Sequence, residues 1–384
     1  MGKWRIVLTV PGGDLPFYVE LSGSPDAPEA FLVNASERTQ VTEVQIAGPR
    51  LSLFLPALNS RIDAEFAGGE LVGTLLLIKR GGVTQEIPLR GTYSQGYMYS
   101  VPTKTEIDVS GRWAVKFTED DGKEYPAVGE FVQEGNKVTG TFLTPVGDYR
   151  YLEGEVVGRD FYLSCFDGGH AFLFKASVNS DGALTGEFWS GTKWHEKWTG
   201  HRDENAALPD PAELTYVKEG FEGLAFTFPR TDGSTLSYPS ERFAGHVVIL
   251  SIEGTWCRNC HDEAPFLAEA YRRYKERGLE IVGLMFEHYR EFDRAAKQVD
   301  RYRTRHRIEH ELVVAGYSDK KEAAEKLPML NHVFAYPTMV FIDRSGEVRK
   351  IHTGFSGPGT GEHYEQFVRD FDALVEELLS EEVE

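Results

Sequence analysis

The sequence predicts a multidomain protein in which an all-β N-terminal region precedes an α/β C-terminal region. Three observations carry this prediction. Roughly the first 200 residues are short alternating segments separated by glycine-rich turns, without a convincing helical period. At 201–211 (HRDENAALPDP) turn-forming and charged residues replace this pattern. From Leu214 onward, strands alternate with amphipathic helices, an order that favours an α/β layer sandwich.

The N-terminal region shows signs of an internal duplication. The motif GKWR at 2–5 opens a predicted strand, and GRWA at 111–114 opens another in the second half. Each half is a meander long enough for a small barrel or for one sheet of a sandwich, with glycine-rich turns that set the strand register. We therefore predict two barrel- or sandwich-like β domains, at 1–100 and 108–204. Clear strands among them are expected at 51–55, 61–66, 71–78 and 86–93.

The C-terminal region, 215–384, is predicted as one α/β domain. Its strands are β-branched or apolar runs, and its helices show an amphipathic period. We expect strands at 247–252, 280–286, 312–315, 338–342 and 348–352, and helices at 262–277, 291–307, 320–327 and 363–379.

Length and charge limit the classes of function. At 384 residues the chain is too long for one core of ordinary size, which agrees with several domains. Lys and Arg number 41 against 60 Asp and Glu, a formal net charge of −19, so nucleic acid and anionic membrane surfaces are not expected as partners. The start of the chain alternates like a strand and lacks the apolar core of a signal peptide.

The three cysteines point to redox chemistry. They are too few for a disulfide scaffold, but Cys257 and Cys260 are spaced Cys-x-x-Cys. A structural zinc site needs four ligands, and even with His261 as a third ligand no second Cys-x-x-Cys completes it, so no metal is expected. Cys165 lies in an apolar strand-like run and is interpreted as a core residue.

The position of the cysteine pair suggests a role for each thiol. The pair follows a buried strand and precedes a helix, so Cys257 falls at a helix N-terminus, where unpaired N–H groups and the helix dipole stabilise a thiolate. Cys260 lies one turn further, close enough to attack a mixed disulfide formed by the first. The spacing predicts Cys257 as the nucleophile and Cys260 as the resolving residue.

These motifs resemble the TlpA/ResA-like branch of thioredoxin-fold thiol-disulfide oxidoreductases. The resemblance covers most of 215–384 and rests on GTWC at 254–257 with Cys260, EAP at 263–265, YPT at 336–338 and DRSG at 343–346. It implies a thioredoxin-like fold whose redox-active group is a Cys257–Cys260 disulfide, with no other cofactor.

The resemblance also implies roles for neighbouring residues. Pro337 would be a cis-proline opposite the cysteine pair, where the backbone of Tyr336 can pair with an extended substrate segment, and Glu263 would relay a proton as the cysteines change state. Trp256 and Arg258 join Tyr336 as predicted substrate-binding residues. The sequence departs from the family at Arg258-Asn259 between the cysteines, where a proline is usual. It departs again at Glu253-Gly254, where many relatives have an aromatic and a small residue.

The function that follows is that of a protein disulfide reductase. We expect a disulfide-bearing client protein and a thioredoxin-like electron donor as partners. The resemblance further implies a bacterial periplasmic or other extracytoplasmic location, as a mature form without its signal segment, and a membrane tether outside this sequence.

Two alternatives stay open at this point. A thiol peroxidase shares the fold, but Trp-Cys-x-x-Cys differs from the Pro-x-x-x-Thr-x-x-Cys arrangement that peroxide reduction uses. The other alternative is a binding module in which the β half recruits a client or ligand. Trp189, Trp194 and Trp198 crowd one hairpin there, although tryptophans in a small barrel more often fill its core.

Overall fold

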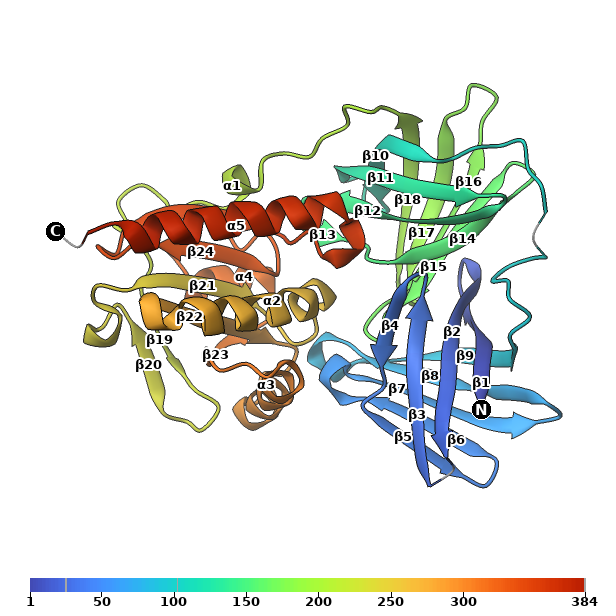
Figure 1. Cartoon of the computed structure of the whole chain (residues 1–384), viewed down its shortest axis with the longest axis horizontal. Helices are drawn as coiled ribbons and strands as arrows, with labels where there is room; N and C mark the ends of the chain where they lie inside the picture. The colour runs from blue at the N-terminus through green and yellow to red at the C-terminus, as the bar shows by residue number, and fades with distance from the viewer. Residues whose placement is uncertain (25, 102, 383–384) are drawn as a thin grey trace. The chain divides into compact units, whose positions relative to one another are not determined.

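The computed structural model describes residues 1–24, 26–101 and 103–382 (Figure 1). The chain forms two compact units. The first holds Met1–Lys79, Val83–Thr144 and Tyr149–Leu208, and the second holds Pro209–Glu384 with the short segments Arg80–Gly82 and Pro145–Asp148. Residue 25 of the first predicted β domain and residues 383–384 of the predicted redox domain lie outside the described residues.

The first sheet is a nine-stranded antiparallel meander with the order β4-β3-β2-β1-β9-β8-β7-β6-β5. Its turns follow from the sequence. The β7–β8 loop consists of Gly68 and Gly69, both with positive φ, as a two-residue type I′ hairpin requires. The strands are β1 (Gly2–Val10), β2 (Gly13–Ser24), β3 (Ala27–Asn34), β4 (Glu37–Gln40), β5 (Glu43–Ala47), β6 (Arg50–Leu55), β7 (Ser60–Ala67), β8 (Glu70–Ile78) and β9 (Thr84–Tyr93).

The second sheet closes on itself. Its order is β11-β10-β18-β17-β16-β15-β14-β12-β13, and an additional pairing of β11 with β12 joins the two sides into a barrel. The strands are β10 (Gly111–Glu119), β11 (Glu124–Glu134), β12 (Lys137–Thr144), β13 (Gly147–Asp148), β14 (Leu152–Val157), β15 (Asp160–Phe166), β16 (Ala171–Val178), β17 (Leu184–Ser190) and β18 (Trp194–Arg202).

Aromatic side chains fill this barrel. Phe142 stacks on Phe174 with ring centroids 4.7 Å apart, and Trp198 packs edge-on against Phe142 at 5.3 Å. Trp198 is therefore a core residue, whereas Trp194 on the same strand is 46% exposed. Cys165 is buried in the same core cluster, as its apolar surroundings predict. With two closely built sheets and no α-helix among its described residues, the N-terminal region is all-β, which confirms the prediction.

The second unit has a thioredoxin-like fold around a five-stranded sheet of order β23-β22-β21-β24-β25. Strands β21, β22 and β23 run parallel, and β24 and β25 are antiparallel to them. The strands are β21 (Val247–Glu253), β22 (Leu279–Glu287), β23 (Glu311–Tyr317), β24 (Thr338–Ile342) and β25 (Val348–Thr353), with a separate hairpin of β19 (Phe226–Pro229) and β20 (Thr235–Tyr238). The helices are α1 (Pro211–Leu214), α2 (Arg258–Tyr274), α3 (Phe292–His306), α4 (Lys320–Lys326) and α5 (Glu362–Ser380).

The alternation of β21 assigns a core to each face of this sheet. Val248, Leu250 and Ile252 belong to the core shared with the β19–β20 hairpin and α4. Val247 and Ile249 point the other way, into the core formed with α2 and α5, which lie side by side in Figure 1. Helix α3 packs beside α2 in a further cluster. Every residue of β21 is buried, so both faces are covered.

Helix α2 begins four residues earlier than its periodicity predicts. The amphipathic pattern starts at Asp262, because the residues before it are cysteine and polar side chains. The structure begins the helix at Arg258, with Cys257 as the N-cap that accepts the Cys260 N–H. The predicted C-terminal end at 277 is met by a short 3₁₀ turn, Lys275–Arg277, after the α-helix ends.

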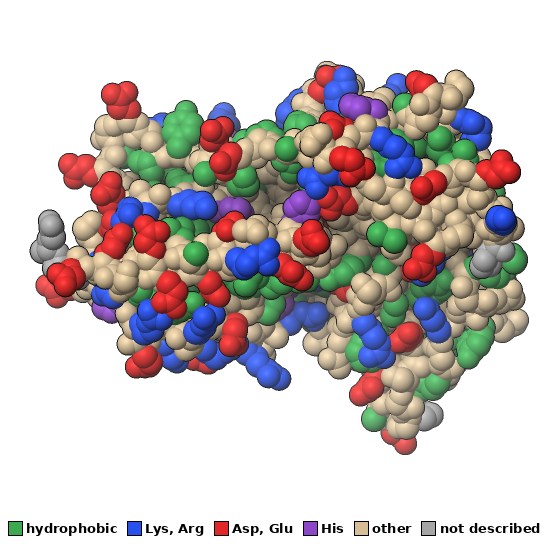
Figure 2. Space-filling view, turned by 45° about the horizontal axis from the view of Figure 1, so that its top comes forward, with side chains coloured by type: hydrophobic (Ala, Val, Ile, Leu, Met, Phe, Trp, Pro, Cys, Tyr) green, Lys and Arg blue, Asp and Glu red, His purple; other side chains and the backbone are tan. Residues whose placement is uncertain are grey.

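Charged side chains of both signs are interspersed on the face that Figure 2 shows. Several of these side chains on the second unit form ion pairs, such as Arg273 with Asp372 at 2.9 Å and Arg277 with Glu376 at 2.6 Å. Among the described residues, no helix is long and apolar enough to cross a membrane.

Candidate active site

The cysteine pair lies where β21 ends and α2 begins. Cys257 Sγ accepts a hydrogen bond from the backbone N–H of Cys260 at 3.2 Å and lies 3.2 Å from the backbone carbonyl oxygen of Tyr336. Both cysteines carry free thiols. Cys257 is 6% exposed and Cys260 is fully buried, so only the first can meet a reaction partner without rearrangement.

The opposite wall of the site comes from the segment before β24. The Tyr336–Pro337 peptide bond is cis, and both residues are buried. The Tyr336 ring meets Trp256 edge-on, with centroids 5.3 Å apart. Trp256 in turn stacks on His288 at 4.6 Å, so that Pro337, Tyr336 and Trp256 are brought together beside Cys257.

Gly254 explains one of the departures from the family pattern. The Trp256 indole folds back over it and donates a hydrogen bond to the Phe286 carbonyl at 2.8 Å. A Cβ at Gly254 would lie 2.4 Å from Trp256 Nε1 and 2.5 Å from that carbonyl oxygen. Only glycine therefore allows this position of the indole.

Arg258 is 4% exposed, so its side chain is buried within the unit rather than presented to solvent. Its charge acts on a buried pair of histidines on α2 and α3. His261 Nε2 donates to the Thr255 carbonyl at 2.8 Å, and its Nδ1 lies 2.7 Å from His306 Nε2. Burial, followed by His306 and Arg258, holds the pKa of His261 well below its usual value, and burial with Arg305 and Arg258 lowers the pKa of His306 to about 3. Both rings are neutral at neutral pH.

Three carboxyl groups are buried around the cysteine pair. Glu263 on α2 accepts a hydrogen bond from Ser251 Oγ at 2.8 Å through one oxygen, and its other oxygen has no hydrogen-bond partner. Glu287 at the end of β22 accepts from the N–H and hydroxyl of Thr255 at 2.9 and 2.6 Å. Glu253 at the end of β21 lies 2.7 Å from the Tyr302 hydroxyl.

Burial is the first cause of raised pKa values in this cluster. It raises the pKa of Glu253 to about 8 and that of Glu287 to about 7. Burial and then the charge of Glu253 raise the pKa of Glu263 well above its usual value. Burial, the hydrogen bond and charge of Cys257, and then both Glu253 and Glu263 raise the pKa of Cys260. A proton can therefore pass among Cys260 and its carboxyl neighbours at pH values near neutrality.

Several of these residues were not predicted as part of the site. Ser251 and Glu253 carry a readable signal, since they interrupt an apolar run on alternate positions and therefore face α2 together. Tyr302, His306 and Glu287 reach the site only through the packing of α3 and β22, which no local pattern reveals. Among the described residues, no group of three or more His, Cys, Asp or Glu side chains is arranged to hold a metal ion.

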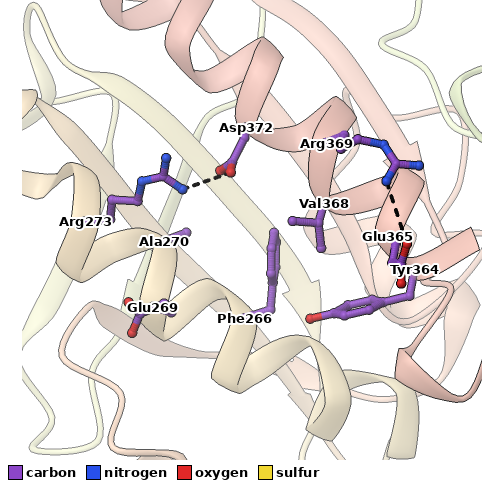
Figure 3. Close-up of a pocket in the computed structure, with 9 residues that line it drawn as sticks. All are labelled: Phe266, Glu269, Ala270, Arg273, Tyr364, Glu365, Val368, Arg369 and Asp372. Carbon is purple, nitrogen blue, oxygen red and sulfur yellow. Dashed lines mark hydrogen bonds and ion pairs between the residues drawn. The ribbon is translucent and has the colours of Figure 1, made fainter. Parts of the chain in front are cut away.

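A groove of about 480 Å³ lies elsewhere on this unit, between α2 and α5 (Figure 3). Phe266, Ala270 and Val368 line it with apolar atoms, and the ion pair of Arg273 with Asp372 borders it. None of the predicted site residues lines this groove, so it is separate from the cysteine pair.

The fold and the buried Cys-x-x-Cys beside a cis-proline are features of a thioredoxin-fold redox protein. Comparison with known proteins agrees with this class. The AhpC/TSA family matches residues 222–351. The chain is similar to the thiol-disulfide oxidoreductase ResA of Halalkalibacterium halodurans, with 26% identity over 169 residues that cover 43% of this chain and 81% of that protein. It is also similar to ResA of Geobacillus kaustophilus, with 29% identity over 142 residues, 37% of this chain and 73% of that protein.

Solved structures give matches over the same share of the chain. One is a thiol:disulfide interchange protein of the thioredoxin family from Chlorobium tepidum, with 20% identity, a TM-score of 0.33, and coverage of 43% of this chain and all of that one. The predicted resemblance of the C-terminal region to ResA-like proteins is thus confirmed.

Proposed function

We propose that the protein is a thiol-disulfide oxidoreductase that reduces disulfides in client proteins through Cys257 and Cys260. The observation that carries the proposal is the placement of Cys257 Sγ, which accepts the Cys260 N–H at the start of α2 and lies beside the Tyr336 carbonyl. A helix N-terminus stabilises a thiolate, and a backbone carbonyl before a cis-proline is a hydrogen-bond acceptor for an extended client segment.

The proposed reaction takes place in two exchanges. The Cys257 thiolate attacks one sulfur of the client disulfide, so a Cys257–client bond forms and the other client sulfur leaves as a thiolate. Cys260 then loses its proton and attacks Cys257 Sγ, which forms the Cys257–Cys260 disulfide and releases the second client thiolate. The client gains two electrons and takes up two protons, and the enzyme dithiol is oxidised to its disulfide. A thioredoxin-like donor, itself a dithiol, returns the two electrons.

Glu263 is the proposed acceptor of the Cys260 proton. It lies in the same buried cluster, and one of its carboxyl oxygens makes no other hydrogen bond. The raised pKa of Glu263 makes it basic enough to take a proton that an exposed glutamate would not hold. As in the sequence-based expectation, the site uses no cofactor other than its own cysteines, and the location we propose is extracytoplasmic.

Trapping of the mixed disulfide tests this function. The full-length Cys260→Ser variant, incubated with a peptide disulfide, should accumulate a covalent adduct on Cys257 that mass spectrometry detects. The Cys257→Ser variant should form none, and Cys165→Ala should behave as wild type. An adduct on Cys260 in the absence of Cys257, or no adduct in any variant, would contradict the proposal.

A thiol peroxidase is the second candidate, because the AhpC/TSA family matches the redox region. Thr255 stands two residues before Cys257 rather than three, which does not match the peroxidase arrangement. Hydrogen peroxide consumption by the reduced protein distinguishes the two. Turnover with peroxide that exceeds turnover with a peptide disulfide would favour the peroxidase. A Cys257→Ser variant with full biological activity would instead favour the binding module.

A further inference from the structure

The hydroxyl of Tyr302 makes two short contacts that one hydrogen atom cannot serve. Its oxygen lies 2.7 Å from Glu253 Oε2 and 2.7 Å from the backbone carbonyl oxygen of Cys260. A phenol carries one hydrogen, and a carbonyl oxygen can only accept. If Tyr302 donates to Cys260, the short contact with Glu253 requires a hydrogen from the carboxyl group. Glu253 is then a neutral carboxylic acid that donates to Tyr302.

The surroundings of Glu253 favour this neutral form. Its side chain follows Val247, Ile249 and Ser251 on the face of β21 that α2 covers, and it is 1% exposed. Its carboxyl group occupies the space above Gly283 on the neighbouring strand, where a Cβ would lie 2.5 Å from Glu253 Oε1. An ionised carboxylate in such a place needs a cation, and no Lys or Arg of the described chain acts on it.

We propose, on the basis of the proposed reductase function, that Glu253 is a positioning residue held as a neutral acid by Tyr302, and that its ionisation limits the resolving step of Cys260 at high pH. In the neutral state the Tyr302 hydrogen points to the Cys260 carbonyl. In the ionised state it turns to the Glu253 carboxylate, and the Cys260 carbonyl loses that donor.

The groups that face Glu253 explain why its charge matters. They are Glu263 and Cys260 on α2, Glu287 on β22 and Tyr302 on α3. None of them is a cation, so a negative charge on Glu253 opposes ionisation of Cys260 and keeps a proton on Glu263. In the resolving step the Cys260 proton passes to the Glu263 carboxylate while the thiolate forms its bond to Cys257 Sγ. The burial that raises the pKa of Glu253 to about 8 delays this opposing charge to alkaline pH.

Carbon-13 NMR of the full-length protein labelled at glutamate Cδ tests the protonation state directly. We expect a neutral carboxyl resonance at pH 7 that titrates near pH 8 and is absent from Glu253→Gln. Tyr302→Phe should shift the same resonance to a higher apparent pKa, because the ionised carboxylate loses its donor. This second variant identifies the resonance even if Glu253→Gln does not fold. A Glu253 resonance that titrates with the exposed glutamates would overturn the proposal.

The rate of the resolving step separates positioning from a merely structural role. Release of the second thiol from a preformed glutathione adduct on Cys257 should be alike in wild type and Glu253→Gln at about pH 6.5. At about pH 9 the variant should be roughly three- to tenfold faster, since it cannot acquire the opposing charge. Glu269→Gln, at an exposed position of the same helix, is the matched control. Equal rates at all pH values would overturn the proposal, whereas an adduct that never resolves in wild type would contradict the proposed function alone, because the NMR titration does not depend on turnover.

Discussion

Single buried carboxyl groups determine how the site responds to pH. Glu287 accepts two hydrogen bonds from Thr255, which favour its charged form, yet complete burial outweighs them and raises its pKa to about 7. Its unfolded-state value lies near 4.5. Between these two values the folded protein holds a proton that the unfolded chain releases, so stability decreases as pH rises through this range.

Replacement of Glu287 by Gln should remove this dependence. One pKa unit corresponds to about 1.4 kcal/mol, so the free energy of unfolding of wild type should fall by roughly 3 kcal/mol more than that of Glu287→Gln between pH 4.5 and pH 8. Urea unfolding at the two pH values measures the difference. Glu269→Gln controls for the loss of an exposed carboxylate, and equal slopes in wild type and Glu287→Gln would show that Glu287 ionises normally.

Glu263 should affect the resolving step rather than the first attack. The Glu263→Gln variant keeps the side-chain shape but cannot take the Cys260 proton, so resolution of a Cys257 adduct should slow at least about tenfold near neutral pH. The rate at which reduced Cys257 attacks a small disulfide should change little. Stopped-flow measurement of the two released thiols separates the steps. Equal slowing of both steps would indicate a general disturbance of the site.

At the scale of elements, the end of β21 combines a structural and a chemical role. The alternation that sends Val247 and Ile249 into the core continues with Ser251 and Glu253, so the same face of one strand changes from apolar to polar under the first turn of α2. The neighbouring strand leaves room for this change at Gly283. Two adjacent strands and one helix therefore build the cluster together.

The Gly283→Ala variant should disturb this arrangement. Its Cβ would lie 2.5 Å from both Glu253 Oε1 and Leu312 Cδ2, and such overpacking typically costs about 1–3 kcal/mol. Denaturant unfolding should show the loss. Gly223→Ala is the matched control, because the nearest atom to its added Cβ lies 3.5 Å away. Similar losses in both variants would contradict the packing argument.

Sequence patterns predict the elements of this protein better than the contacts between them. The apolar runs of β21 and β24 and the Cys-x-x-Cys after a buried strand suffice to locate the cysteine pair. They do not reveal that α2 starts at Arg258, because the helix-capping contact of Cys257 leaves no periodic signal. They also do not reveal Tyr302, whose position depends on how α3 packs against α2 more than forty residues away in the chain.

At the scale of the whole molecule, each unit has cores of its own. The β unit packs its two sheets around separate apolar clusters, and the redox unit buries three clusters on the two faces of its sheet. The buried residues around Cys257, such as Glu263 and Tyr302, all belong to the redox unit. The chemistry of the cysteine pair should therefore depend on that unit.

A fragment that starts at Pro209 tests this independence. It should fold and keep a Cys257–Cys260 reduction potential within about 15 mV of the full-length value, which corresponds to a change of about 0.7 kcal/mol in the dithiol–disulfide equilibrium. Circular dichroism checks the fold, and equilibration with glutathione gives the potential. A folded fragment with a clearly different potential would show that the β unit influences the redox site.

The most direct test of the account is the redox equilibrium of the cysteine pair in the full-length protein. Equilibration in graded glutathione or dithiothreitol buffers, followed by Trp256 fluorescence and by mass spectrometry of the alkylated thiols, gives its reduction potential. We predict a reversible two-electron transition between Cys257 and Cys260 at about −250 mV or lower, as expected of a reductase supplied by a thioredoxin-like donor. A potential near about −120 mV would contradict the reductase direction, and no reversible disulfide between the two cysteines would contradict the account as a whole.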